Sequence, residues 1–152
     1  MKFHLVSGAC GFVGRNTVNQ LLKRTNDSVL MVDDLSVGTH PSTWLKDTIV
    51  KNFKDIEIFW KDERLFYWKT DFRKFLNSLN ENPNWLNTEY GLKIDRISYA
   101  FHFAAIVGGR AKIEGNPMAV ALDLSIDAEF LTGLQKLNRK EYYTRVLLRL
   151  IQ

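Results

Sequence analysis

The sequence of 152 residues contains a single cysteine and no long apolar run. Cys10 has no second cysteine with which to form an internal disulfide, which fits a reducing compartment. No run of about 18 or more apolar residues occurs, so we do not expect a membrane span. An apolar, strand-like stretch starts within two residues of Met1 and leaves no room for a secretory signal. We therefore expect a cytoplasmic protein.

The chain also lacks the residue patterns of several other site classes. Three scattered histidines and one cysteine give no metal-ligand spacing, so we expect no metal site. No Gly-Lys dipeptide occurs, which excludes a nucleoside-triphosphate loop of the P-loop type. Residues 1–135 carry 16 basic and 16 acidic side chains, and residues 136–152 carry five basic and one acidic. The net charge of +4 therefore belongs to the end of the chain and does not indicate a nucleic-acid-binding face.

The composition, with 45% apolar and 25% charged residues, is typical of a globular protein. The start of the chain has a clear pattern of predicted strands and helices. Phe3–Val6 is an apolar run typical of a buried parallel strand. A glycine-spaced turn over Gly8–Gly14 follows, and Asn16–Arg24 has helical spacing. Val29–Val32 then predicts a second strand that ends at Asp33. Together these segments predict one strand–helix–strand unit.

The rest of the chain is less regular. We expect a helix over Pro41–Phe53, a strand over Leu65–Lys69 that leads to Asp71, a helix over Phe72–Leu79, a polar loop over Asn80–Gly91, a strand over Ile97–Phe103 and a helix from Pro117 toward Leu137. The alternation predicts an α/β fold of the Rossmann type, with a parallel sheet of about four to five strands and flanking helices. We expect an incomplete dinucleotide-binding domain over residues 1–135 and a divergent basic and apolar tail over 136–152. The aromatic residues between Phe53 and Phe75 are expected to pack in the core rather than to stack on bases.

The segment Ser7–Gly14 is the most informative part of the sequence. Binding of a diphosphate at a strand-to-helix turn requires a tight turn, close approach of the backbone, and a helix N-terminus with free amides. Gly8, Gly11 and Gly14 suit these roles because a side chain at any of them would intrude. The alternative is that they are three ordinary turn residues.

Asp33 lies 19 residues after Gly14, at the end of the second predicted strand. This position suits a carboxylate that accepts hydrogen bonds from the ribose of an adenosine. The same carboxylate would repel a 2′-phosphate, so the sequence favours NAD over NADP. The alternative is that Asp33 or Asp34 only caps a turn.

With these residues in view, the chain resembles the extended short-chain dehydrogenase/reductase family, in particular the NAD-dependent epimerases and dehydratases of nucleotide sugars. The resemblance rests on four segments: Ser7–Gly14, Asp33–Ser36 with the following Gly38, Thr70–Phe72, and Phe101–Ala105 with the later Asn116 and Pro117. It implies that the cofactor contacts Gly8, Gly11, Phe12, Val13 and Gly14 at the pyrophosphate, Asp33, Asp34, Leu35 and Ser36 at the ribose and adenine, Asp71 and Phe72 beside the adenine, and Phe103, Ala104 and Ala105 along the nicotinamide. It also implies that His102 is a packed structural histidine.

The catalytic pair that the resemblance implies, a tyrosine followed four residues later by a lysine, is absent from the chain. None of the five tyrosines has a lysine at that spacing. Because members of the family continue well beyond this length, we expect a chain truncated before the motif, with no catalytic residue of its own. The expected function is an NAD(H)-binding domain of an isomerase-like nucleotide-sugar enzyme, whose substrate would bind only if further sequence or a partner chain completed the site.

Two alternatives stay open at this point. The chain could be a non-enzymatic interaction module, or one half of a split epimerase that needs a partner chain. The apolar residues of the tail could pack on the sheet as a replacement element, or stay exposed and promote homo- or hetero-association.

Overall fold

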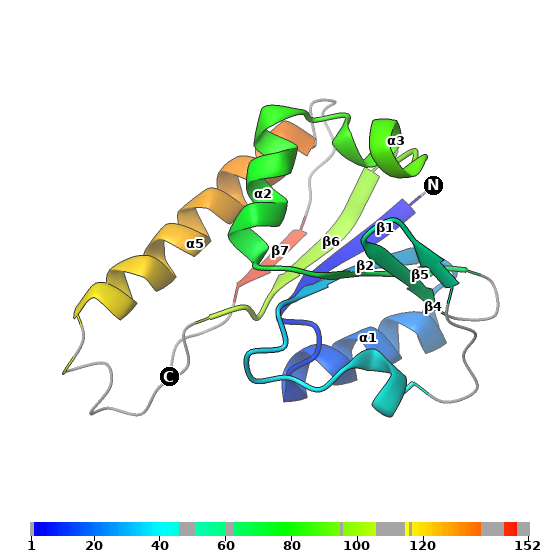
Figure 1. Cartoon of the computed structure of the whole chain (residues 1–152), viewed down its shortest axis with the longest axis horizontal. Helices are drawn as coiled ribbons and strands as arrows, with labels where there is room; N and C mark the ends of the chain where they lie inside the picture. Colours follow the sequence, from blue (N-terminus) through cyan, green and yellow to red (C-terminus); the bar gives the residue numbers. More distant parts are fainter. Residues whose placement is uncertain are drawn as a thin grey trace.

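The computed structural model describes residues 2–45, 51–59, 63–94, 96–105, 115, 117–137 and 145–148. Its strands are β1 (Lys2–Ser7), β2 (Ser28–Asp33), β3 (Lys51–Phe53), β4 (Ile56–Phe59), β5 (Leu65–Lys69), β6 (Arg96–His102) and β7 (Arg145–Leu148). Its helices are α1 (Phe12–Arg24), the short 3-10 helix η1 (Pro41–Thr43), α2 (Phe72–Glu81), α3 (Trp85–Tyr90) and α5 (Pro117–Leu137). The strands form one sheet in the order β3-β4-β5-β2-β1-β6-β7 (Figure 1).

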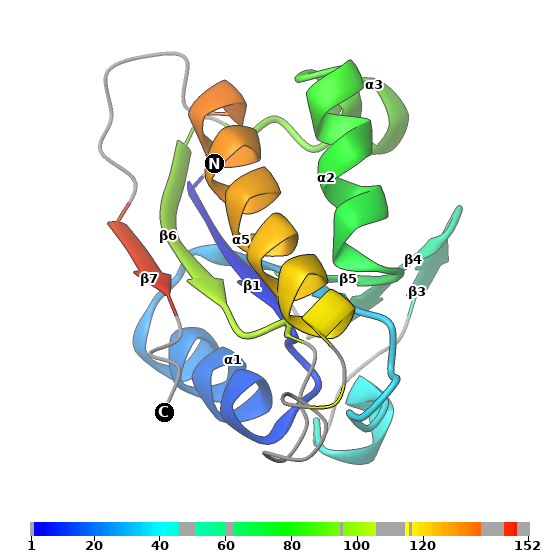
Figure 2. The same cartoon turned by 90° about the vertical axis from the view of Figure 1, so that its left-hand side faces the viewer.

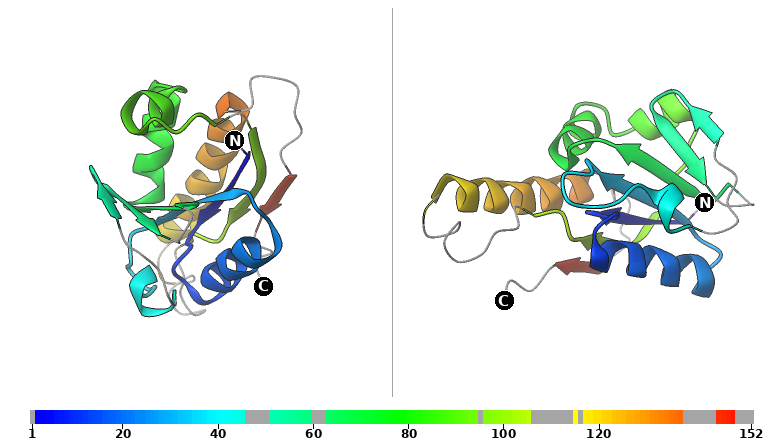
Figure 3. Two further views of the ribbon diagram at one scale, coloured as in Figure 1. Left: turned by 90° about the vertical axis from the view of Figure 1, so that its right-hand side faces the viewer. Right: turned by 60° about the horizontal axis from the view of Figure 1, so that its bottom comes forward.

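The sheet is the middle of three layers. Helices α2, α3 and α5 cover one face, and α1 covers the other (Figures 2 and 3). Strands β5, β2, β1, β6 and β7 run parallel, and β3 and β4 add an antiparallel pair at one edge. Covering on both faces explains why β1, β2 and β5 are near-continuous apolar runs rather than alternating ones. No helix among the described residues is both long enough and apolar enough to cross a membrane.

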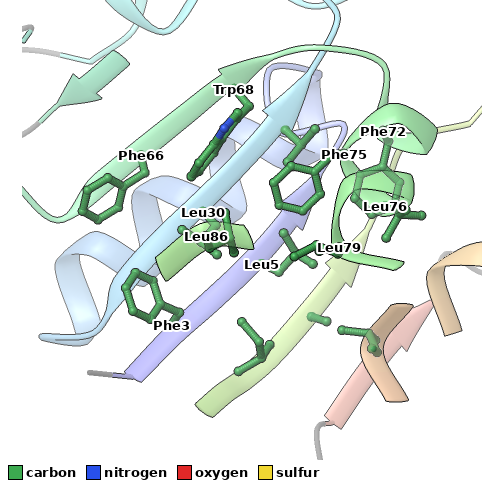
Figure 4. Close-up of a cluster of buried hydrophobic side chains, with 14 of the residues drawn as sticks. Phe3, Leu5, Leu30, Phe66, Trp68, Phe72, Phe75, Leu76, Leu79 and Leu86 are labelled. Carbon is green, nitrogen blue, oxygen red and sulfur yellow. The ribbon is translucent and has the colours of Figure 1, made fainter. Parts of the chain in front are cut away.

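The larger part of the core lies between the sheet and helix α2. Figure 4 shows side chains of β1, β2 and β5, such as Leu5, Leu30 and Trp68, facing Phe75 and Leu76 of α2. Each of these five side chains is no more than 1% exposed. The aromatic residues of β5 and α2 are therefore core residues, as expected from the sequence.

The structure confirms the Rossmann-type α/β fold and most of the predicted elements. Leu65–Lys69 and Pro117–Leu137 have the bounds that the sequence predicts. The sheet nevertheless has seven strands, more than the four to five expected, and β3 and β4 were not predicted as strands.

Two predicted segments were wrong. Pro41–Phe53 is not a helix in its described part: the His40 side chain caps the short η1, and Lys51–Phe53 pairs antiparallel with Ile56–Ile58. The polar segment Asn80–Gly91 is not a plain loop, because it contains α3. This helix ends at Gly91, whose left-handed φ of 67° closes the last turn.

Six residues of the expected tail are described: Lys136 and Leu137 end helix α5, and Arg145–Leu148 form the edge strand β7. Strand β7 pairs parallel with β6, from Tyr99↔Arg145 to His102↔Leu148. The pairing concerns the backbone of Arg145–Leu148, and both alternatives for the apolar side chains of the tail stay predictions. The last four residues of the chain and Asn116 lie outside the described residues.

Candidate functional site

The site is built where the order of the strands reverses. From β1 the chain adds β2 and β5 on one side and then returns to place β6 on the other side of β1. Ser7 at the end of β1 pairs with Val32 of β2 and with His102 of β6, so the three strands end together. In parallel α/β sheets, the crevice outside the carboxyl ends of the strands at such a reversal is the usual ligand-binding place.

Two of the three glycines in the turn after β1 are required by the protein's own packing. Gly8 has a left-handed φ of +61°, and a Cβ there would lie 2.6 Å from both the Phe103 carbonyl carbon and the Ala104 nitrogen. A Cβ on Gly14 would lie only 2.2 Å from the Gly8 carbonyl oxygen. Helix α1 and the segment after β6 can therefore approach the turn closely only because side chains are missing at Gly8 and Gly14.

Gly11 is different, since its Cβ would meet nothing closer than the Gly8 oxygen at 3.5 Å. It is the N-cap of α1, and no side chain caps the helix there. The first N–H groups of the helix, which start at Phe12 and Val13, have no partner within the helix and mark the positive end of its dipole. The Phe12 and Val13 side chains are 74% and 55% exposed. The turn thus offers bare amides and open space to an anion.

Asp33 connects this turn to the end of β2. Its Oδ2 accepts a hydrogen bond of 2.9 Å from the Cys10 N–H, and its Oδ1 accepts one of 2.8 Å from the Leu35 N–H. Burial raises the pKa of the Asp33 carboxyl, while the two N–H groups favour the charged form. Because each carboxylate oxygen has a second lone pair, Asp33 can still accept hydrogen bonds from a ligand hydroxyl.

The loop after Asp33 contains two successive turns, each closed by an aspartate side chain that accepts a backbone N–H. Asp34 Oδ1 accepts from the Ser36 N–H at 2.9 Å, so both aspartates cap turns whether or not they also bind a ligand. Leu35 has a left-handed φ of 62°, an unusual conformation for a residue with a side chain. This conformation brings the loop back toward the glycine turn.

Two further residues hold the loop and the turn together, and sequence reasoning gave neither of them this role. A Cβ on Gly38 would lie 2.7 Å from the backbone of Cys10. The Tyr67 hydroxyl donates to the Asp33 carbonyl oxygen at 3.2 Å and also interacts with Cys10. Burial raises the pKa of the Cys10 thiol to about 12, aided by the nearby Asp33 charge, so Cys10 is a packed neutral thiol. Gly38 belongs to a segment of the family resemblance, but no pattern in the sequence indicates its contact with Cys10.

The end of β5 leads to Asp71 and Phe72, the pair that the resemblance places beside the adenine. Asp71 caps α2 by accepting from the Arg73 N–H at 2.8 Å, and its carboxylate lies 3.1 Å from the Arg73 guanidinium. Burial tends to raise the pKa of Asp71, but the contacts with Arg73 bring it below its usual value. The Phe72 side chain is 5% exposed and packs against His102 and Phe130. Of this pair, only the Asp71 side chain is open to solvent.

The segment after β6 lies directly beside the glycine turn. Phe103 donates its N–H to the Ser7 carbonyl oxygen at 3.1 Å, and Phe103, Ala104 and Ala105 are half-buried. The structure therefore brings three predicted groups together: the glycine turn, the loop that starts at Asp33, and the segment 103–105. This arrangement can hold an anion at the helix terminus with a hydroxyl-bearing group next to it.

Comparison with solved structures finds a similar fold in several enzymes. The chain matches an epimerase of Methanothermobacter thermautotrophicus with 19% identity and a TM-score of 0.58, covering 90% of this chain and 32% of that one. It matches the UDP-glucose 4-epimerase of Thermotoga maritima, solved with UDP-glucose, with 18% identity and a TM-score of 0.56, covering 97% and 37%. It matches the Bordetella bronchiseptica enzyme WbmF, solved with NAD⁺ and UDP, with 20% identity and a TM-score of 0.59, covering 97% and 34%.

No protein-family model and no curated protein sequence matches the chain. The chain spans about a third of the length of these solved structures. At this level of identity the likeness concerns the fold. The chain therefore has the fold of these three enzymes over the part of them that it covers.

Proposed function

We propose that this chain binds NAD(H), as the dinucleotide-binding domain of a nucleotide-sugar epimerase- or dehydratase-like protein. The observation that carries the proposal is the position of Gly11 and the bare amides after it, next to the Asp33 carboxylate at the strand reversal. Solved structures of the same fold hold NAD⁺, among them WbmF and the UDP-glucose 4-epimerase of Stenotrophomonas maltophila. The resemblance of the four sequence segments points to the same cofactor.

The residues fit the cofactor in two places. The open space before Gly11, which a Cβ would occupy, suits the diphosphate, and the N–H groups of Phe12 and Val13 would hold it. The free lone pairs of Asp33 would accept the hydroxyls of the adenosine ribose. A 2′-phosphate would meet Asp33 and Asp34 together, and this repulsion favours NAD over NADP.

The segment Phe103–Ala105 would lie along the nicotinamide side of the same crevice. Small side chains at Ala104 and Ala105 suit the place where a flat ring crosses the strand ends. When bound, the nicotinamide would supply a hydride acceptor. The residues of this chain would bind and orient it.

We propose in addition that these 152 residues do not turn over a substrate by themselves. The resemblance implies a catalytic tyrosine and lysine four residues apart, and this sequence has no such pair. A nucleotide-sugar substrate and its chemistry would require residues from another chain or from further sequence. A cytoplasmic location stays a prediction.

The test is calorimetric titration of the purified protein with NAD and with NADP. We expect NAD to bind and NADP to bind at least about tenfold more weakly, since an added like-charge contact of roughly 1.4 kcal/mol has that effect. The variant Asp33→Asn should lose most of this discrimination, while Asp55→Asn, a control on the far edge of the sheet, should keep it. Equal affinity for the two dinucleotides would remove the role proposed for Asp33, and no binding of either would remove the cofactor assignment.

A further inference from the structure

The loop between β2 and η1, residues 34–40, is held by hydrogen bonds rather than by apolar burial, because none of its residues is fully buried. It starts from Asp33, whose Oδ2 accepts the Cys10 N–H at 2.9 Å. It returns to the same residue at Thr39, whose N–H donates to the Cys10 carbonyl oxygen at 3.3 Å. Both ends of the loop are therefore attached to the glycine turn, and the second attachment includes a long, weak hydrogen bond.

His40 follows this weak attachment directly, and its imidazole has a partner on each nitrogen. Nδ1 lies 2.8 Å from the Ser42 hydroxyl oxygen and accepts the Ser42 N–H at 3.3 Å, which caps η1. Nε2 forms a hydrogen bond of 3.3 Å with Oε1 of Glu57 on β4 and lies 3.1 Å from Oε2 of the same carboxylate. The His40 and Glu57 side chains are 32% and 29% exposed, so solvent and salt screen the pair only in part.

The contacts of Nδ1 fix the tautomer of the neutral imidazole of His40. Because Nδ1 accepts the Ser42 N–H, it carries no proton, and the proton of the neutral ring is on Nε2. Nε2 therefore donates its proton to the Glu57 carboxylate. A hydrogen bond to a charged acceptor contributes more than one between neutral groups.

Aromatic rings hold the imidazole from the side of the sheet. The rings of His40 and Tyr67 meet edge to face with their centroids 5.7 Å apart, and the ring of Phe59 lies 6.2 Å from the imidazole. The Tyr67 hydroxyl donates to the Asp33 carbonyl oxygen at 3.2 Å. The imidazole at the end of the loop therefore packs against the same side chain that contacts the residue where the loop starts.

The antiparallel pair β3–β4 lies at the edge of the sheet and contains none of the residues proposed to contact the cofactor. We infer that His40 and Glu57 form a clasp through which β4 holds the loop 34–39 against the glycine turn, and with it the ribose side of the proposed site. The effect on NAD affinity rests on the proposed function; the clasp itself does not. His40 and Glu57 are positioning residues, because the contacts proposed for this loop are at Asp33–Ser36.

The first test is nitrogen NMR of the His40 imidazole in the unmodified protein, which needs neither a variant nor a cofactor. We expect Nε2 to carry a proton at neutral pH. An Nε2 without a proton would overturn the clasp, because the ring nitrogen and the Glu57 carboxylate would then face each other as two acceptors.

The second test uses Glu57→Ala and the conservative Glu57→Gln, whose amide oxygen can still accept the imidazole proton. The matched control is Glu89→Ala, which removes the 2.9 Å ion pair between Glu89 and Lys54, at the turn of the same β3–β4 hairpin. We expect the amides of Cys10 and Thr39 to exchange with solvent about tenfold faster in Glu57→Ala, roughly the loss of one hydrogen bond. They should exchange at nearly the original rate in Glu57→Gln and in the control.

NAD affinity should fall about threefold to tenfold in Glu57→Ala and stay nearly unchanged in the other two variants, because one indirect hydrogen bond is lost. Both alanine variants lose one ion pair of the hairpin, so a general loss of stability would affect them alike. Exchange and affinity in Glu57→Ala that equal those of Glu89→Ala would overturn the proposal. If the unmodified protein binds no NAD, the proposed function fails, and the imidazole and exchange measurements still decide on the clasp.

Discussion

Replacing Gly11 by alanine separates folding from ligand binding more cleanly than any other change in the glycine turn. The added Cβ would meet the Gly8 oxygen at 3.5 Å, an ordinary contact, and the φ of −70° at Gly11 suits any residue. Alanine is a poorer N-cap than glycine by about 1 kcal/mol, and a less flexible unfolded chain returns about 0.4–1 kcal/mol. The free energy of unfolding should therefore change by less than about 1 kcal/mol.

The matched comparison is Gly14→Ala, in which the Cβ would lie 2.2 Å from a backbone oxygen that cannot easily move. Overpacking of this kind costs about 3 kcal/mol. In a chain of this size, that loss lowers the melting temperature by about 6–12 °C.

The assay measures thermal unfolding and NAD affinity on both variants. We expect Gly11→Ala to melt near the original temperature. It should nevertheless bind NAD at least about tenfold more weakly, because the methyl group occupies the space in front of the helix amides. A tenfold loss of affinity corresponds to about 1.4 kcal/mol. Gly14→Ala should lose both stability and binding. Unchanged NAD affinity in Gly11→Ala would refute the placement of the diphosphate over this helix terminus.

Three further predictions concern stability and reactivity. Arg64→Met removes guanidinium hydrogen bonds to the carbonyl oxygens of Leu22, Thr25 and Asp27, and denaturant titration should show a loss of stability of about 1.5–3 kcal/mol. A loss below about 0.5 kcal/mol, typical of a surface substitution, would contradict this role. Burial lowers the pKa of His4, so the unfolded chain binds the proton more readily, and stability should fall as the pH drops below about 6.5, by up to about 1.4 kcal/mol per pH unit. In His4→Gln that slope should be smaller, and an equal slope would assign it to other groups. Cys10, with its pKa raised to about 12, should react with iodoacetamide about a thousandfold more slowly in the folded protein than in urea, and similar rates would contradict its burial.

The sequence predicted those strands and helices whose apolar pattern is typical of the element that they form. Leu65–Lys69 has no charged residue before its last position, and a parallel strand covered on both faces requires such a run. The helix α3 was missed because its signals are only its ends, Asn84 and the left-handed Gly91, within a polar segment. Pro41–Phe53 had helical spacing, but the antiparallel pairing of Lys51–Phe53 overrode that local preference.

In the site, the sequence predicted which residues would meet but not how they bind one another. The spacing of Gly8, Gly14 and Asp33 was enough to place them at one crevice. That both oxygens of Asp33 accept backbone N–H groups depends on the loop conformation at Leu35, which no local pattern specifies. The contact between the Ser7 hydroxyl and His102 Nδ1 joins residues 95 positions apart, and the parallel pairing of β1 with β6 brings them together.

The most direct measurement is an amide NMR titration of the protein with NAD. The account predicts that the largest changes in chemical shift fall on the backbone N–H groups of residues 11–14 and 33–36, at the start of α1 and after β2, and that they saturate together. Saturation that leaves both groups unchanged, or no change at millimolar NAD, would contradict it.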